Sequence, residues 1–173
     1  MMNAAMECML TRRSCRAFSD RMPERSIIEE VCCVGTYAPT GRGMQSPLIL
    51  AVTDRAMRDR LSAMNAAIFG RQGDPFYGAP VVLVVLADRS VPTYSYDGPS
   101  VLCQLANAAN AAGLASCWIH RAKEEFDSDE GKTILRNLGI EGDYEGIGHL
   151  VLGYPASELP PAAPRKPDYV RWI

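Results

Sequence analysis

The spacing of apolar residues predicts alternating helices and strands along the chain. Apolar side chains recur every three to four residues over 23–37 and 54–69, which is typical of amphipathic helices. Residues 47–52 and 80–86 are short, β-branched apolar runs; the second is continuous enough to predict a central strand covered on both faces. The remaining predictions are helices over 3–11, 99–112 and 128–138, a short strand over 116–119 and a last strand over 145–154.

Helix boundaries follow from capping residues. Asn3 and Asp97 are candidate N-caps, because a short polar side chain accepts a hydrogen bond from the first helical turn. Gly113 lies where the helix of residues 99–112 should end, and Pro23 lies where the second helix should begin. Between the second helix and the first strand, residues 38–43 predict a loop with two glycines.

The predicted helix of residues 99–112 has no charged face. No Asp, Glu, Lys or Arg occurs between Asp97 and Arg121, and alanines surround Val101, Leu102 and Leu105. A helix without a charged face is buried on nearly all sides. Since a single small domain hardly covers a central helix completely, we infer a homodimer that forms through this helix.

The last part of the chain, residues 155–173, predicts an extended arm. It is rich in proline, which excludes a helix over most of its length. It also carries Tyr169, Val170 and Trp172, which a free tail does not need. We therefore expect a single domain over 1–173 whose C-terminal arm packs as an extended segment, over the other subunit in our interpretation.

Composition excludes several classes of protein. The 173 residues are 47% hydrophobic and 22% charged, with a net charge of −2, which favours one globular domain and no nucleic-acid partner. The longest apolar run, 79–87, is too short to cross a membrane, and no secretory signal is evident. The six cysteines show no C-x-x-C spacing, so we expect reduced, mostly buried thiols, no metal site and a cytoplasmic protein. The role of Cys32-Cys33 stays open.

A cluster of cations near the N-terminus is the clearest candidate for binding chemistry. It consists of Arg12, Arg13, Ser14 and Arg16. Arginine suits a phosphate dianion, because its planar fork of donors can bind two oxygens at once. In an extended segment Arg12, Ser14 and Arg16 project from one side. A solvated basic turn is the alternative, so other parts of the chain must decide.

Side chains typical of acid–base catalysis are scarce. His149 lies inside the last predicted strand and is expected in the core, whereas His120 follows a strand at a loop edge and is a candidate proton donor. No nucleophile elbow, zinc-protease motif or P-loop is present, and Gly41-Arg42-Gly43 does not follow a strand. A phosphate clamp without an evident acid, base or metal site indicates that a cofactor carries the chemistry.

Five motifs, taken in order, closely resemble the nitroreductase family of FMN-dependent oxidoreductases. They run from about residue 10 to 167 and are Arg12-Arg13-Ser14-x-Arg16-x-Phe18, Ala38-Pro39-Thr40-Gly41 with Gln45 and Pro47, Tyr77-Gly78-Ala79-Pro80, Gly113-Leu114-Ala115-Ser116-Cys117-Trp118-Ile119, and Leu152-Gly153-Tyr154-Pro155 with Arg165-Lys166.

The resemblance implies an α+β fold with a central, mostly antiparallel sheet flanked by helices, in an intertwined homodimer with FMN at the subunit interface. It implies that Arg12, Arg13 and Ser14 hold the phosphate, joined by Arg165 or Lys166. Arg16 would reach the ribityl chain and the pyrimidine edge of the flavin. The other implied FMN-binding residues are Pro39, Thr40 and Gly41 from the partner, and Gln45, Trp118, Ile119, His120 and Gly153.

The activity implied is reduction of nitro compounds, quinones or similar acceptors by NADH or NADPH, through ping-pong hydride transfer. The flavin N5 would carry the chemistry, with His120 as a candidate proton donor. Gly43 and Pro47 depart from the commoner family pattern and bear on the acceptor range, and Gln104 stands where many members have Asn. A non-catalytic FMN-binding or sensory dimer and a different reductive reaction, such as dehalogenation, remain alternatives. The substrate and the choice between NADH and NADPH stay open.

Overall fold

In the computed structural model, which describes residues 2–173, a four-stranded antiparallel sheet lies at the centre of the fold. Its strands, in spatial order, are β1 (Pro47–Val52), β2 (Val81–Asp88), β4 (Tyr144–Gly153) and β3 (Ala115–Ile119). The apolar run of β2 pairs with β1 on one side and β4 on the other, and its first seven residues are completely buried. The prediction of a central strand covered on both faces is confirmed.

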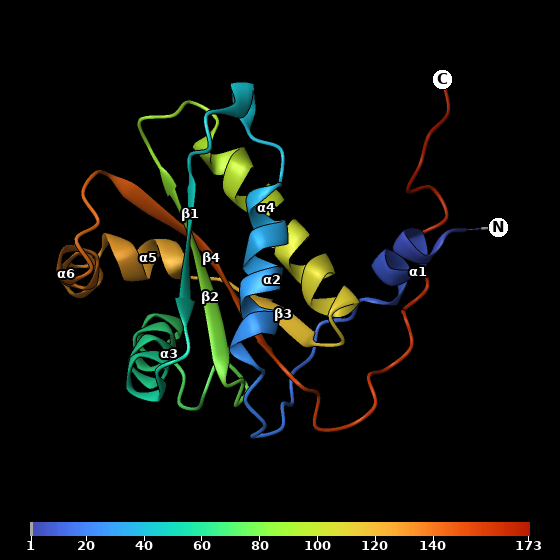
Figure 1. Ribbon diagram of the computed structural model, residues 1–173, viewed down its shortest axis with the longest axis horizontal. Coiled ribbons are helices and arrows are strands. Elements are labelled where there is room, and N and C mark those ends of the chain that lie inside the picture. The colour runs from blue at the N-terminus through green and yellow to red at the C-terminus, as the bar shows by residue number, and fades with distance from the viewer. Residues whose placement is uncertain (1) are drawn as a thin grey trace.

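Helices cover both faces of the sheet (Figure 1). On one face, α2 (Arg25–Thr36) and α4 (Tyr94–Ala111) pack over the alternate residues Val81, Leu83 and Val85 of β2. On the other face, α3 (Arg55–Phe69), α5 (Ala122–Asp127) and α6 (Asp129–Asn137) pack over Val82 and Val84. The α+β fold with a central antiparallel sheet flanked by helices is as the sequence predicts.

The long helix α4 joins two remote segments of the chain (Figure 1). At its C-terminal end, Asn110 Nδ2 donates to the Cys8 carbonyl oxygen, 2.8 Å away, in α1 (Ala4–Thr11). Near its N-terminal end, Asp97 Oδ1 accepts from the Gly41 N–H at 2.9 Å, in the short turn η1 (Gly41–Gly43). Asn110 lies thirteen positions after Asp97, which corresponds to about 20 Å at 1.5 Å per residue. The two segments therefore lie far apart within one chain.

Several predicted boundaries change. The α4 helix begins at Tyr94 with Thr93 as its N-cap, so Asp97 is not the cap but a buried residue of the first turn. The second helix begins at Arg25, after Pro23 and the N-cap Glu24. A short helix, α5, occupies residues that the pattern left as loop. The expectation that most cysteines are buried is wrong: all six are free thiols, but only Cys15 and Cys117 are buried.

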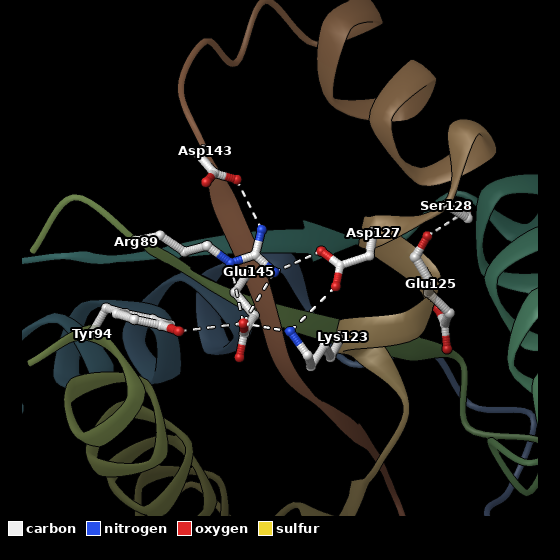
Figure 2. A network of polar contacts seen from close by, with 8 residues as sticks. All are labelled: Arg89, Tyr94, Lys123, Glu125, Asp127, Ser128, Asp143 and Glu145. Carbon is white, nitrogen blue, oxygen red and sulfur yellow. Dashed lines mark hydrogen bonds and ion pairs between the residues drawn. The ribbon is translucent and has the colours of Figure 1, made fainter.

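An ion-pair network fastens α5 to the sheet (Figure 2). Arg89, which follows β2, pairs with Asp127 of α5 at 2.7 Å and with Glu145 of β4 at 3.0 Å. Lys123 bridges the same two carboxylates at 3.2 and 2.7 Å. Burial raises the pKa of both carboxyls, but hydrogen bonds from the two cations outweigh it, so both pKa values are lowered. The network thus anchors the helix whose N-terminus borders the candidate site.

Exposed apolar side chains occur on α4, on α1 and in the C-terminal tail. In α4, Tyr96 and Cys103 face solvent. Met6 and Met9 of α1 are more than half exposed, and Trp172 of the tail is 93% exposed. Figure 1 shows the tail running outward past α1 in extended form. Among residues 2–173, no helix combines the length and apolar character that crossing a bilayer requires.

Candidate functional site

The arginine-rich segment is extended and lies alongside strand β3. Ser14 forms a parallel bridge with Ser116, and the Cys15 N–H donates to the Ser116 carbonyl oxygen at 2.9 Å. Phe18 forms an antiparallel bridge with Pro155. Cys15 is 2% exposed and Phe18 9%, whereas Ser14 and Arg16 are exposed. Ser14 and Arg16 therefore project outward on either side of the buried Cys15, as predicted, but the alternation ends at Ala17, which is exposed.

Cations gather around Cys117 on β3. Burial raises the pKa of the Cys117 thiol, while the charges of Arg16 and Arg12 and a hydrogen bond from the Ser14 side chain act to lower it. Arg16 and Cys117 line the same cavity beside this strand. Within residues 2–173, neither Arg12 nor Arg16 forms an ion pair with a carboxylate. The cluster therefore keeps unneutralised positive charge.

Arg13 behaves differently from its neighbours. Its Nη1 donates to the carbonyl oxygens of Leu10 and Arg12, at 2.7 and 2.8 Å, and so satisfies carbonyls at the end of α1. Its Nε is buried without a hydrogen-bond partner among the described residues. Arg13 thus orients the segment and still has one donor unmet.

A cavity of about 550 Å³ opens beside this segment. Arg16 lies on one side, and Cys117, Trp118, Ile119 and His120 of β3 and its end line the wall. The Trp118 and His120 rings stack with 6.4 Å between centroids, and Trp118 is 40% exposed. The rest of the lining comes from the end of α3, the loop after it and the start of α5, namely Phe69, Arg71, Gln72, Gly73, Asp74, Pro75, Tyr77 and Arg121.

A buried polar network supports the end of β3. Asn65 Nδ2 donates to the His120 carbonyl oxygen at 2.8 Å and also to Glu125 Oε1, while Asn65 Oδ1 accepts from Arg121 Nε at 2.9 Å. Glu125 Oε2 lies 3.0 Å from Nε2 of His149, and both residues are completely buried. The predicted core position of His149 is confirmed. Asn65 is also completely buried, so its hydrogen bond fixes the His120 backbone to the core.

The loop between α2 and β1 is held by the Asp97 carboxylate. Its oxygens accept from the Gly41 N–H at 2.9 Å, the Ser46 hydroxyl at 2.7 Å and the Thr93 hydroxyl at 3.0 Å. Burial alone raises the pKa of Asp97, but these three donors lower it below its usual value. Gly41 is required here, because a Cβ would lie 2.3 Å from Thr93 Oγ1.

The same loop borders a second cavity, of about 410 Å³, between α2 and β1. Thr40 and Gln45 line it, together with Cys32. Burial raises the pKa of the Cys32 thiol to about 11. Within one chain, the predicted FMN-binding residues that line cavities therefore form two separate groups. Arg16, Trp118, Ile119 and His120 share one cavity, and Thr40 and Gln45 share the other.

Comparison with known proteins gives a consistent result. The model of the nitroreductase family matches residues 9–72. A protein of Archaeoglobus fulgidus, provisionally named an NADH dehydrogenase/NAD(P)H nitroreductase, is 29% identical over 162 residues, covering 91% of this chain and 88% of its own. Both matches support the resemblance to the nitroreductase family.

Solved structures of nitroreductases share the fold over their whole length. The Bacteroides fragilis nitroreductase, solved with bound FMN, superposes with a TM-score of 0.91 at 22% identity, covering 99% of this chain and 100% of that chain. The Desulfitobacterium hafniense nitroreductase, also solved with FMN, gives 0.88 at 24% identity with both chains fully covered. The nitroreductase fold predicted from the motifs is confirmed.

The other predicted FMN-binding residues do not line either cavity; they are Arg12, Arg13, Ser14, Pro39, Gly41, Gly153, Arg165 and Lys166. Gly153 pairs with Ala115 at the end of β4, and a Cβ there would lie 2.7 Å from Pro80 Cδ, so the residue serves close packing. Arg165 Nη1 donates to the Ala163 carbonyl oxygen, and Lys166 lies over the Tyr169 ring, so both make their contacts within the exposed tail. Pro39 is exposed in the loop after α2.

Sequence reasoning missed the far wall of the larger cavity. The sequence analysis assigns no role to residues 71–75, yet Arg71, Gln72, Gly73, Asp74 and Pro75 supply much of that wall. Two cations could have indicated this wall from the sequence: Arg71, which follows Phe69 closely, and Arg121, which directly precedes α5. Among the described residues, no group of His, Cys, Asp and Glu side chains is arranged to hold a metal ion.

Proposed function

We propose that this protein is an FMN-dependent oxidoreductase that uses NADH or NADPH to reduce a small-molecule acceptor, such as a nitro compound or a quinone. The observation that carries the proposal is the extended segment along β3, which turns Ser14 and Arg16 outward beside an aromatic-lined cavity. The family and the FMN-bound neighbours support the same cofactor.

The residues present fit FMN. Clustered guanidiniums without carboxylate partners repel one another, and a bound phosphate dianion removes that repulsion. The buried, unpartnered Nε of Arg13 is a further unmet donor in the same segment. In this proposal Arg12, Arg13 and Ser14 hold the phosphate, and Arg16 faces the pyrimidine side of the flavin. Arg165 or Lys166 joins them from a tail.

When bound, FMN supplies the redox chemistry: it accepts a hydride from the nicotinamide and passes the electrons to the acceptor. The chain's own contribution is placement and charge. Arg16 provides a fixed cation that stabilises negative charge on the pyrimidine side. His120, exposed at the cavity edge with its backbone held by Asn65, is placed to give a proton to the acceptor.

The proposed active unit is a homodimer. Thr40, Gly41 and Gln45 lie at the opposite end of α4 from the arginine segment, so they would reach a flavin bound to Arg12 and Arg16 of a second chain. The part of α4 after Asp97, which has no charged residue and is exposed at Cys103, and the extended tail would form the contact between chains. We expect each flavin to be bound by residues of both subunits.

Two measurements test the proposal. The purified protein should show the absorbance of oxidised flavin, and it should oxidise NADH or NADPH in the presence of menadione or nitrofurazone. Double-reciprocal plots should be parallel, because donor and acceptor would use one open cavity in turn.

The Arg12→Ala variant should lose flavin on gel filtration. The Arg136→Ala variant, which replaces an exposed arginine of α6, should retain it. A protein that binds FMN but consumes neither nucleotide would reject the enzymatic function and favour a non-catalytic flavin-binding dimer.

A further inference from the structure

Two arginines opposite Arg16 share one aromatic ring at the cavity edge. The guanidinium carbon of Arg121 lies 4.2 Å from the centroid of the Phe69 ring, and that of Arg71 lies 4.8 Å from it. All three residues line the larger cavity with Arg16. Within the described chain, none of these three arginines forms an ion pair with a carboxylate. The cavity edge therefore carries positive charge that the phosphate clamp of FMN does not account for.

The one carboxylate in the lining, Asp74, does not neutralise these cations. It forms an ion pair with Arg58, accepts from the Ser62 hydroxyl at 2.6 Å, and accepts from the N–H groups of Phe76 and Gly78 at 2.9 and 2.7 Å. Burial raises the pKa of Asp74, but these donors together lower it, so the group stays ionised and fully engaged. The negative charge of Asp74 is thus compensated by Arg58 and the neighbouring donors, and the arginines at the cavity edge keep their positive charge.

Arg121 is fixed in place by the fold. Its Nε donates to Asn65 Oδ1 at 2.9 Å, and the same amide donates to the buried Glu125. The Arg121 backbone has φ 79°, in the left-handed region, which is unfavourable for a residue with a Cβ. A held side chain on a strained backbone is typical of a functional position. One edge of the guanidinium is thus anchored, and the two terminal nitrogens are left without a recorded partner within residues 2–173.

We propose that Arg121 and Arg71 form a subsite for an anionic group on the acceptor, so that this enzyme prefers acceptors bearing a carboxylate. The inference rests on the proposed function and names its substrate class. A planar guanidinium binds a carboxylate through two parallel hydrogen bonds. Phe69 and Tyr77 add apolar, aromatic surface beside it, which suits a flat ring. The substrate class is therefore a small aromatic acid that carries a reducible nitro or quinone group.

Paired acceptors test this directly. With FMN-loaded protein and saturating NADH, kcat/KM is measured for 4-nitrobenzoate and for its neutral analogue 4-nitrobenzamide. The wild type should prefer the anion, and the ratio of the two values should fall roughly tenfold to a hundredfold in Arg121→Met, as for loss of a charge-assisted hydrogen bond. Arg121→Lys should fall less, because it keeps the charge but loses the fork. Arg136→Met removes the same charge from α6 and should leave the ratio unchanged.

A binding measurement separates this inference from the proposed function. Quenching of tryptophan fluorescence by the same two nitro compounds, in protein freed of flavin, should show tighter binding of the anion in the wild type but not in Arg121→Met. If the protein neither binds FMN nor oxidises NADH, the proposed function fails and this titration still decides the subsite. The inference is overturned if both ratios are unchanged by Arg121→Met. It is equally overturned if the variant raises only the KM for NADH or only the dissociation constant of FMN.

Discussion

Replacing Asp97 should show how the fold positions the loop of residues 38–43. Asp97 is 3% exposed and accepts hydrogen bonds from Gly41, Ser46 and Thr93. A hydrogen bond to a charged group is worth about 1.5–3 kcal/mol, and a buried donor left unsatisfied costs about 1–3 kcal/mol. The two hydroxyls can rotate toward other acceptors, but the Gly41 N–H cannot. Asp97→Ala should therefore lower the free energy of unfolding by about 3–5 kcal/mol.

Asp97→Asn is the matched control. The amide oxygen can still accept from the Gly41 N–H, and the amide nitrogen can donate to the Ser46 and Thr93 hydroxyl oxygens. Only the charge is lost, so we expect a decrease of about 1–2 kcal/mol. Because the folded pKa of Asp97 is lowered, its contribution is complete above about pH 4, the unfolded value, and decreases as pH falls further. The asparagine variant should lack this part of the acid dependence.

Urea unfolding, followed by circular dichroism at one fixed protein concentration, measures these differences. The concentration must be fixed because the stability of a dimer depends on it. Retained flavin should fall in Asp97→Ala, since the loop that carries Thr40 and Gly41 is no longer tied to α4. A decrease below about 1 kcal/mol in Asp97→Ala, or equal decreases in both variants, would refute the role assigned to this carboxylate.

Three further predictions concern the interface and the site. Cys103→Asp should yield folded monomers on sedimentation because Cys103 is exposed in the chain, whereas Ala108→Asp should unfold the chain itself, because Ala108 is buried within it; a stable Cys103→Asp dimer would contradict the α4 interface. Arg12→Ala should mainly weaken FMN binding, whereas Arg16→Ala should also lower the reduction potential of the flavin. For a charge about 6 Å away at an effective dielectric constant near 20, the decrease is at most about 60 mV. Equal potentials in wild type and Arg16→Ala would refute that difference. His120→Ala should slow turnover by about tenfold to a hundredfold without loss of FMN, and complete loss of NADH oxidation would mean that His120 does more than donate a proton.

The parts of the fold that depend on local pattern were predictable. The continuous apolar run of β2 identified the central strand, and Asn3 does cap α1, accepting from the Met6 N–H at 3.0 Å. The alternation in the arginine segment also follows from local geometry, because Cys15 and Phe18 are apolar and turn inward. Local rules work there because each residue's environment is decided by its immediate neighbours.

The parts that depend on distant partners were not predictable. Asp97 resembled a helix cap, but its role comes from donors more than fifty residues away, at Gly41 and Ser46. The helix α5 was missed because it is short and contains Glu125, a charged residue that is completely buried against Asn65 and His149. A buried carboxylate is read as a surface residue when its partners lie on other elements. The cationic edge of the cavity was missed because Arg71 and Arg121, which both lie over the Phe69 ring, are far apart in the sequence.

The measurement that tests the proposed function most directly is an anaerobic titration of the purified protein with NADH and, separately, with NADPH. The arginine segment beside the aromatic cavity predicts bound flavin, whose absorbance near 450 nm should bleach with about one equivalent of at least one nucleotide per flavin. Bleaching should then be reversed by menadione. A protein that purifies without flavin and takes up none, or whose bound flavin stays oxidised in both titrations, would contradict it.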